Sequence, residues 1–251
     1  ISAAQVASFI ADPSSFVGYF GGIAVIVEGA ISHTEASQLN AVNATSITAT
    51  VAQTTAANIA AISVDNSSRT SLNAFTFTVS DTTASASALN SVKAITSVAP
   101  IFTSVTGITS SSAADIVTLY TGTNATLGNE TIVISDTTLA ASTLNAIDGY
   151  TTSLVTATAA TTITGLVADV NTAYVADDNG TITGLGNEAV TITDTSVAAA
   201  TLNLVNAQTT GRVTVNSSTI TGTYAAINTA LVANAAEPVA GDPAVATGNT
   251  I

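Results

Sequence analysis

Short stretches in which apolar residues alternate with threonine recur along the chain, and each is followed by an alanine-rich stretch. The segment 189–193 (AVTIT) alternates in this way, which is typical of a strand with one buried face. Asp194 and Thr195 come next and offer an N-cap to a helix over 196–207 (SVAAATLNLVNA). The pattern therefore predicts a strand that leads directly into a capped helix.

The same order of elements then appears a second time. The segment 211–216 (GRVTVN) is a second strand candidate, and 223–233 (TYAAINTALVA) is a second short helix. One face of that helix is apolar and carries Ala226, Ile227, Ala230 and Leu231. The complete stretch predicts the order β-α-β-α, with roughly 25 to 30 residues in each half.

This stretch is one of several copies in the sequence. Three copies match closely: 79–92 (VSDTTASASALNSV), 134–147 (ISDTTLAASTLNAI) and 192–205 (ITDTSVAAATLNLV). The fourth copy, 31–42 (ISHTEASQLNAV), is two residues shorter and has His33 in place of an aspartate. All four contain a Leu-Asn pair, and these pairs fall 50 to 58 residues apart: Leu39-Asn40, Leu89-Asn90, Leu144-Asn145 and Leu202-Asn203.

A second motif follows each first one, so every repeat has two halves. The copies of the second motif are 54–62, 111–120, 165–174 and 222–231. The link between repeats also recurs, as LGNETIVISD and LGNEAVTITD, which places Glu130 and Glu188 at equivalent positions. We therefore expect a partial repeat at 1–22, an array of about four repeats over 23–236 (23–64, 75–122, 130–176 and 188–236), and an extended tail or linker at 237–251.

Helices of about ten residues and strands of about five are marginal alone, because each buries too little surface to offset its ordering. Stacking against a neighbouring copy supplies the missing burial. The sequence thus predicts an α/β fold in which tandem β-α-β-α repeats stack as a solenoid or as a row of small sandwich units. An all-β sandwich or solenoid is the alternative, since threonine-rich segments such as Thr156 to Thr164 also suit strands.

Charge narrows the range of partners. Sixteen acidic residues face three basic ones, and the net charge of -13 would repel phosphate backbones and anionic lipids, so we expect no nucleic-acid binding. Only 8% of the residues are charged, which is unusual for a cytosolic surface and favours an extracellular or cell-surface location. The longest apolar stretch, 16–27, is too short to cross a bilayer, and no transmembrane segment is expected.

Candidates for catalysis are few. His33 is the single imidazole, and it stands where other copies carry aspartate, so it is more simply a diverged helix cap than part of a catalytic triad. The sequence contains no GxGxxG, P-loop, HExxH or GxSxG motif and no cysteine. We therefore expect that the protein is not an enzyme and that it needs no cofactor, with calcium as the one candidate left open.

Two groups of carboxylates bear on calcium. Asp177, Asp178 and Asn179 precede Gly180, and oxygen ligands beside a glycine turn can hold calcium, although a solvated turn explains the same residues. The repeated aspartates are most simply repeat-capping residues at helix starts, but stacked repeats would also align them in rows that cations could neutralise: Asp81, Asp136 and Asp194.

Six Asn-x-Ser/Thr sequons occur in the chain, at Asn43, Asn66, Asn124, Asn129, Asn179 and Asn216. Such sequons are acceptor sites for N-linked glycans in secreted proteins. In a chain this rich in serine and threonine they also arise by chance, so the sequence alone leaves glycosylation undecided.

The D-T-x-x-A-A-x-x-L-N motif (136–145 and 194–203), the ADVNTAY motif (168–174) and the TTAANIAAI motif (54–62) resemble the tandem repeats of very large secreted proteins of cyanobacteria and proteobacteria. Those proteins are described as surface-layer, haemolysin-like or adhesin-like. The resemblance implies export and a scaffold or adhesive role, and it carries over no catalytic residue. The calcium-binding nonapeptides of some such proteins are absent from this sequence.

Together these features lead to an expected function. We expect an extracellular structural repeat protein that self-assembles through end-to-end repeat contacts into a filament, a sheath or a surface layer. The alternative is an adhesin or ligand-presenting stalk segment of a larger surface protein, which would share the repeats but remain monomeric.

Overall fold

The computed structural model describes residues 1–11, 23–40, 44–62, 72–122, 126–235 and 245–247. Within these residues the chain forms helices and parallel strands, so the predicted α/β class is confirmed and the all-β alternative is wrong. The contacts divide the chain into two compact units. The first comprises 1–109 and 115–127, and the second comprises 110–114 and 128–251.

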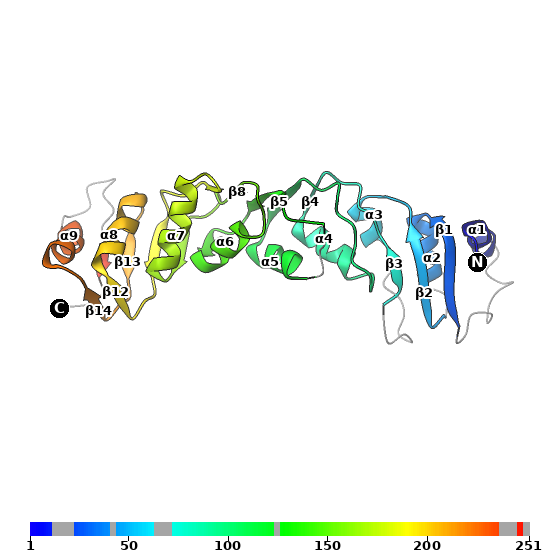
Figure 1. Cartoon of the computed structure of the whole chain (residues 1–251), viewed down its shortest axis with the longest axis horizontal. Coiled ribbons are helices and arrows are strands. Elements are labelled where there is room, and N and C mark those ends of the chain that lie inside the picture. Colours follow the sequence, from blue (N-terminus) through cyan, green and yellow to red (C-terminus); the bar gives the residue numbers. More distant parts are fainter. Residues whose placement is uncertain (12–22, 41–43, 63–71, 123–125, 236–244, 248–251) are drawn as a thin grey trace. The chain divides into compact units, whose positions relative to one another are not determined.

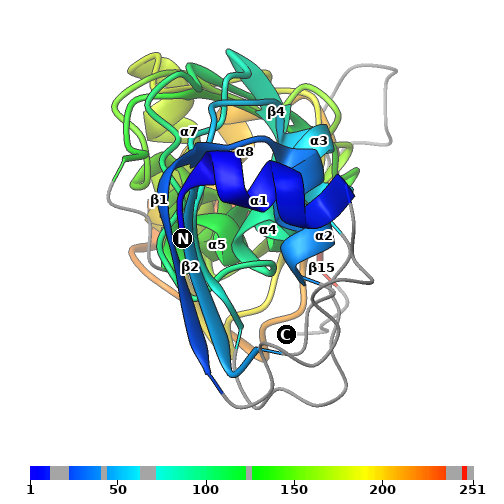
Figure 2. The ribbon, with the colours of Figure 1, turned by 90° about the vertical axis from the view of Figure 1, so that its right-hand side faces the viewer.

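In the first unit short helices alternate with short strands (Figures 1 and 2). Figure 2 shows strands β1 and β2 along one side of this unit and helix α2 on the other. The last strand and helix straddle the division between the units. The elements are α1 (Ala3–Ala11), β1 (Ala24–Ile31), α2 (His33–Asn40), β2 (Ser46–Val51), α3 (Ala56–Ala60), β3 (Ala74–Thr76), β4 (Thr83–Ser85), α4 (Ala86–Lys93), β5 (Gly107–Ser111) and α5 (Ala113–Thr121).

In the second unit four helices follow one another side by side, α6 next to α7, α7 next to α8 and α8 next to α9 (Figure 1). The elements are β6 (Thr131–Ile134), β7 (Thr138–Ala140), α6 (Ala141–Asp148), β8 (Val155–Thr156), β9 (Thr162–Gly165), α7 (Val167–Asp178), β10 (Ile182–Thr183), β11 (Ala189–Ile192), β12 (Ser196–Ala198), α8 (Ala199–Gln208), β13 (Val213–Val215), β14 (Thr219–Thr221), α9 (Tyr224–Ala235) and β15 (Val245–Thr247).

The main sheet of the second unit shows how one repeat joins the next. Its strand order is β15-β13-β11-β9-β7, and every pair is parallel. Strand β9 is the last strand of one predicted repeat, and β11 is the first strand of the following one. The two strands pair in register, with Val190 opposite Ile163. Neighbouring parallel strands require a crossover connection, and each crossover in this sheet contains a helix and a further strand. Repeats are therefore joined through their backbones as well as their side chains.

The core consists of thin layers of small and branched side chains. In the second unit Ile132, Val155 and Ile182 lie in register on neighbouring strands, and all three are fully buried. The repeated leucines of the Leu-Asn pairs are at most 1% exposed. The first unit adds larger side chains, with Phe75 and Phe77 packed at a ring-centroid distance of 5.8 Å. Strand registers place the apolar positions inward, as the alternating pattern predicts.

The structure differs from the sequence-based prediction at the start of the repeat helices. The helix predicted over 196–207 begins at Ala199, because 196–198 form strand β12, which pairs with 219–221 in β14. Val197 is 1% exposed on that strand. A three-residue strand has no periodicity that distinguishes it from the first turn of a helix, so only the pairing partner reveals it.

Both ends of the chain are described in part. Helix α1 lies in the predicted partial repeat, and residues 12–22 are outside the described residues. In the predicted tail, 245–247 form strand β15, which pairs in parallel with β13, and the rest of 237–251 is outside the described residues. Across the part of the chain that the structure describes, no helix is both long and apolar enough to cross a membrane.

Candidate functional site

The contacts between successive halves form a set that recurs along the chain, and we treat this set as the candidate functional site. The first contact comes from the asparagine of the Leu-Asn pair. The Nδ2 group of Asn90 donates to the carbonyl of Asp115 at 2.9 Å, that of Asn145 to Asp169 at 2.9 Å, and that of Asn203 to Ala226 at 3.0 Å. Each bond joins the first helix of a repeat to the second helix.

The second contact is made by the repeated aspartates. Carboxylates of Asp81, Asp136 and Asp194 accept from the backbone N–H groups of Ala56, Ala113 and Val167, each at 2.7 Å. These N–H groups belong to the first residues of α3, α5 and α7. The aspartates thus lie at helix starts, but each contacts the helix that precedes it by 23 to 27 residues rather than the helix that follows it.

Helix α7 shows why this cap from a later half matters. Its own N-cap residue, Leu166, has no side-chain hydrogen bond to the helix. Asp194 supplies an acceptor and a negative charge at the N-terminus, where both the free N–H groups and the helix dipole favour them. In α3, by contrast, the local Thr55 hydroxyl also accepts from Asn58. The next half therefore completes the start of α7.

The third contact uses a buried threonine after the first helix of each repeat. The hydroxyls of Thr96, Thr151 and Thr209 donate to the carbonyls of Phe75, Glu130 and Glu188 at 2.6, 2.6 and 2.8 Å. Each threonine is at most 9% exposed. In return the hydroxyl oxygen accepts from a backbone N–H two residues later, at Val98, Ser153 and Gly211. The hydroxyl therefore fixes the loop against the preceding strand.

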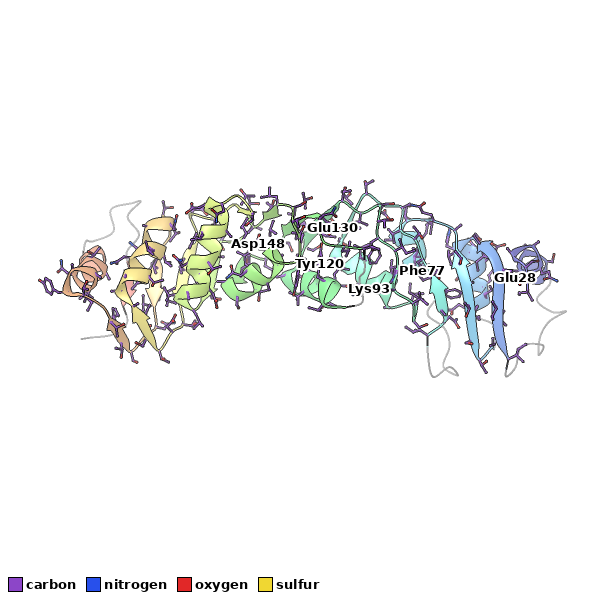
Figure 3. All side chains as sticks on the ribbon, in the orientation of Figure 1. Glu28, Phe77, Lys93, Tyr120, Glu130 and Asp148 are labelled. Carbon is purple, nitrogen blue, oxygen red and sulfur yellow. The ribbon has the colours of Figure 1, made fainter. Side chains whose placement is uncertain are left out.

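These three threonines identify one equivalent position in three repeats, and that position holds different chemistry in each unit. Phe75 in the first unit and Glu130 and Glu188 in the second are all fully buried. Glu130 accepts from the N–H groups of Gly128 and Asn129 at 2.9 and 3.2 Å. Figure 3 shows Glu130 among the side chains of this unit. The buried Glu130 and Glu188 carboxylates thus turn inward onto their own loops.

Glu188 has a second buried partner. Its Oε2 atom accepts from the Gly186 N–H at 2.8 Å and from the Tyr174 hydroxyl at 3.2 Å. Among the described residues its Oε1 atom has no hydrogen-bond partner. Burial raises the pKa of the Tyr174 phenol far above its usual value, and the negative charge of Glu188 raises it further. Tyr174 therefore remains a neutral donor to this carboxylate.

One helix-to-helix contact appears in a single repeat. Lys93, labelled in Figure 3, ends α4 and donates to the carbonyls of Thr118 and Leu119 in α5 at 3.2 and 3.0 Å. A cation is favourable at the C-terminal end of a helix, where the carbonyl groups gather. Partial burial lowers the pKa of the Lys93 ammonium group. Asp148 takes the equivalent position in the next repeat and accepts from the Thr181 hydroxyl instead, at 3.2 Å.

The residues predicted as a calcium candidate lie at the end of a helix. Asp177 and Asp178 are in the last turn of α7, and Asn179 is its C-cap. Gly180 follows with a φ of 78°, a conformation that favours glycine and ends the helix. Asp177 accepts from the Leu185 N–H at 3.2 Å and Asp178 from the Gln208 amide at 2.7 Å. These two carboxylates therefore tie the end of α7 to the following link and to α8.

The surroundings of the acidic side chains and of His33 bear on metal and imidazole chemistry. No group of three or more histidine, aspartate or glutamate side chains is arranged to hold a metal ion in the portion of the chain described. His33 is the first residue of α2, and the preceding Ser32 forms the cap, since its hydroxyl accepts from the Glu35 N–H at 3.2 Å. The Glu35 carboxylate accepts in turn from the Ser32 N–H at 2.7 Å, which is a capping box.

Comparison with protein-family models, with curated proteins and with solved structures finds no match to this chain. The similarity to tandem repeats of secreted proteins therefore stays a prediction that rests on the motifs quoted above.

Sequence reasoning missed the roles of the Leu-Asn asparagine and of the buried threonine. The asparagines were visible as a repeated pair, but their partners lie 23 to 25 residues away in a different helix. The threonines are hidden among many others, and only their position after each first helix sets them apart. Repetition at equivalent positions was the available signal in both cases.

Proposed function

We propose that the chain is an extracellular structural repeat protein that self-assembles end to end into a filament, a sheath or a surface layer. The repeated contacts between halves support this proposal. Within a repeat the first helix bonds to the second through an asparagine, and the next repeat completes the second half, as Asp194 completes the start of α7. A structure built in this way extends by adding further copies of the same contact.

The observation that carries the proposal is a packing surface at α9 that the described part of the chain leaves largely exposed. In the preceding repeat Ile163 is fully buried and Val167 is 6% exposed, because β11 pairs with β9 and Asp194 contacts the start of α7. The equivalent residues before and in α9 are Ile220, which is half-buried, and Tyr224, which is 85% exposed. A further half from another copy of the chain would cover this surface as the next half does within the chain.

Surface composition supports a location outside the cell. With 8% charged residues, the exposed surface is covered mainly by threonine, serine, asparagine and alanine. Copies that each carry a net charge of -13 repel one another, but at physiological ionic strength this repulsion is screened beyond a Debye length of about 8 Å. Close approach of identical subunits is then governed by the fit of their ends.

Electron microscopy of the protein purified from its natural source tests the proposal. Regular filaments or sheets are expected, and a parallel sample with a chelator shows whether cations between carboxylates contribute. Dispersed monomers at high protein concentration would contradict self-assembly and favour the stalk of a larger adhesin.

A matched pair of variants makes the test specific to the exposed end. Tyr224→Glu places a charge on the exposed surface at α9, and Leu204→Glu places the same charge on a side chain of α8 that is 59% exposed. We expect Tyr224→Glu to prevent assembly while its circular dichroism stays that of the natural chain, and Leu204→Glu to assemble normally. Equal loss in both variants would mean that added charge alone, rather than this surface, prevents assembly.

A further inference from the structure

The Asn-x-Ser/Thr sequons are distributed unevenly with respect to burial. Three of them lie in the described residues, at Asn129, Asn179 and Asn216, and all three asparagine side chains are exposed. Of the ten other asparagines whose exposure is described, only two are exposed, Asn187 and Asn228. Chance placement of hydroxyl residues two positions later would not favour exposed asparagines in this way.

Of the eight asparagines that the structure describes as buried or half-buried, six make side-chain hydrogen bonds that a glycan would destroy. The amide group of Asn145 donates to the next helix, and that of Asn73 donates to Asn40 at 2.6 Å while its oxygen accepts from the Ile47 N–H. These asparagines carry alanine, isoleucine or another residue without a hydroxyl two positions later. Among the described asparagines, sequons are thus confined to side chains that have room for a modification.

The three exposed sequons also share a local setting. Asn129 lies in the turn directly before β6, Asn179 is the C-cap of α7, and Asn216 directly follows β13. The hydroxyl residue of each sequon is itself exposed. Turns on the surface leave both the amide nitrogen and the hydroxyl accessible to an enzyme.

We propose that Asn129, Asn179 and Asn216 carry N-linked glycans, an inference that rests on the extracellular location proposed above. The Nδ2 atom forms a bond to the anomeric carbon of an oligosaccharide carried on a lipid pyrophosphate. The bond from that carbon to the pyrophosphate oxygen breaks, the lipid pyrophosphate leaves, and the amide loses one proton. Hydrated glycans then cover turns of a surface that has few charges of its own.

The chain contains its own control for this inference. Asn187 occupies the turn before β11 that corresponds to Asn129 before β6, and it is also exposed. Ala189 stands two residues later, where Thr131 completes the sequon of Asn129. Asn187 should therefore be bare in the natural chain, and Ala189→Thr should create one additional glycan. The substitution is mild, because Ala189 is exposed at the first position of a strand, where threonine is favoured.

Mass spectrometry of the whole protein from its natural source, followed by peptide mapping, tests the proposal. We expect the peptides that contain Asn129, Asn179 and Asn216 to exceed the mass of their sequences by that of a glycan, and the peptide that contains Asn187 to have the mass of its sequence. In a secreting host that performs N-glycosylation, Asn129→Gln, Asn179→Gln and Asn216→Gln should each remove one glycan, and Ala189→Thr should add one. Bare asparagines at all three sites in the natural protein would overturn the inference.

Locating the natural protein separates the two proposals. A protein found outside the cell with three bare sites would refute glycosylation and leave the structural role standing. A bare protein found in the cytoplasm would refute both.

Discussion

The first and second units solve the same packing problem with different chemistry. The difference lies at the residue whose carbonyl accepts from the repeated threonine. At this position the first unit buries Phe75 against Phe77, and the second unit buries Glu188 against Tyr174 and the Gly186 N–H. The backbone is alike in both, since Thr96 and Thr209 make the same hydroxyl bond to the carbonyl of that residue. The side chain differs, while its backbone position is held by the same bond.

Contacts that both units share differ in kind from the side chains that they do not share. The parallel strand pairing, the buried leucine and the threonine hydroxyl bond occur in both units, so these contacts define the repeat. The side chain at the position of Phe75, Glu130 and Glu188 has to be buried, but it can be of either kind. An apolar side chain packs in a cluster, and a carboxylate accepts hydrogen bonds from local donors. Four substitutions or conditions test this division.

Leu144→Asp changes a feature that both units share, and we expect the largest effect from it. Leu144 is fully buried in α6, as Leu89 is in α4, so the substitution buries a charge that has no partner. The free energy of unfolding should fall by about 3–5 kcal/mol, as measured by urea denaturation with circular dichroism. Leu204→Asp, at a leucine that is 59% exposed, is the control and should change stability little. A folded, assembling Leu144→Asp protein would show that the Leu-Asn register is not the core.

Replacing Glu188 with an apolar residue tests directly whether the second unit needs a carboxylate at this position. Glu188→Leu leaves the Gly186 N–H and the Tyr174 hydroxyl buried without their acceptor, which should cost about 1–3 kcal/mol for each group. Adding Tyr174→Phe removes the second of these groups and should restore part of the stability. A double-mutant cycle measures this coupling. Strictly additive effects would show that the pair does not interact.

Alkaline pH should weaken the second unit through Tyr174. Its pKa is raised in the folded chain, whereas in the unfolded chain it is about 10. The folded and unfolded chains both hold the proton below that pH. Above it the unfolded chain loses the proton first, so the free energy of unfolding should fall by about 1.4 kcal/mol for each further pH unit.

Urea unfolding at pH 9 and pH 11 measures this effect. In Tyr174→Phe the additional loss at pH 11 should disappear, whereas Tyr224→Phe, at a tyrosine that is 85% exposed, should retain it. The same loss in Tyr174→Phe as in the natural chain would assign the pH dependence to other groups.

Removing one cap should have the smallest effect and should differ between the units. Asp194→Ala takes the acceptor from the start of α7, which has no local side-chain cap, and should cost about 1 kcal/mol. Asp81→Ala should cost less, because Thr55 still caps α3. Hydrogen exchange at the Val167 and Ala56 N–H groups reports the two losses. Asp169→Ala removes the same charge from the first turn of α7 without removing the cap, and equal exchange in it would deny Asp194 this role.

Local patterns in the sequence were sufficient to find one strand and one helix in each half of the repeat, although the structure has two or more strands before several of these helices. Alternation at 189–193 and the alanine-rich stretch after it correctly indicated a strand and a helix, which the structure places at Ala189–Ile192 and Ala199–Gln208. The three residues of β12 were missed, because they are strand only through their pairing with β14. The calcium candidate of Asp177 and Asp178 was placed in a turn, although the last turn of a helix contains both residues.

Periodicity within one copy was enough to predict the repeat, its two halves and the apolar positions that are buried, and it favoured the α/β class over the all-β alternative. The partner of each polar group became known only from the folded chain. Asp194 caps the helix behind it, β9 pairs with a strand of the next repeat, and Glu188 turns inward to Tyr174. Such partners lie 14 to 27 residues apart. Whether such partners meet depends on how successive repeats pack against one another, and no pattern within a single copy specifies that packing.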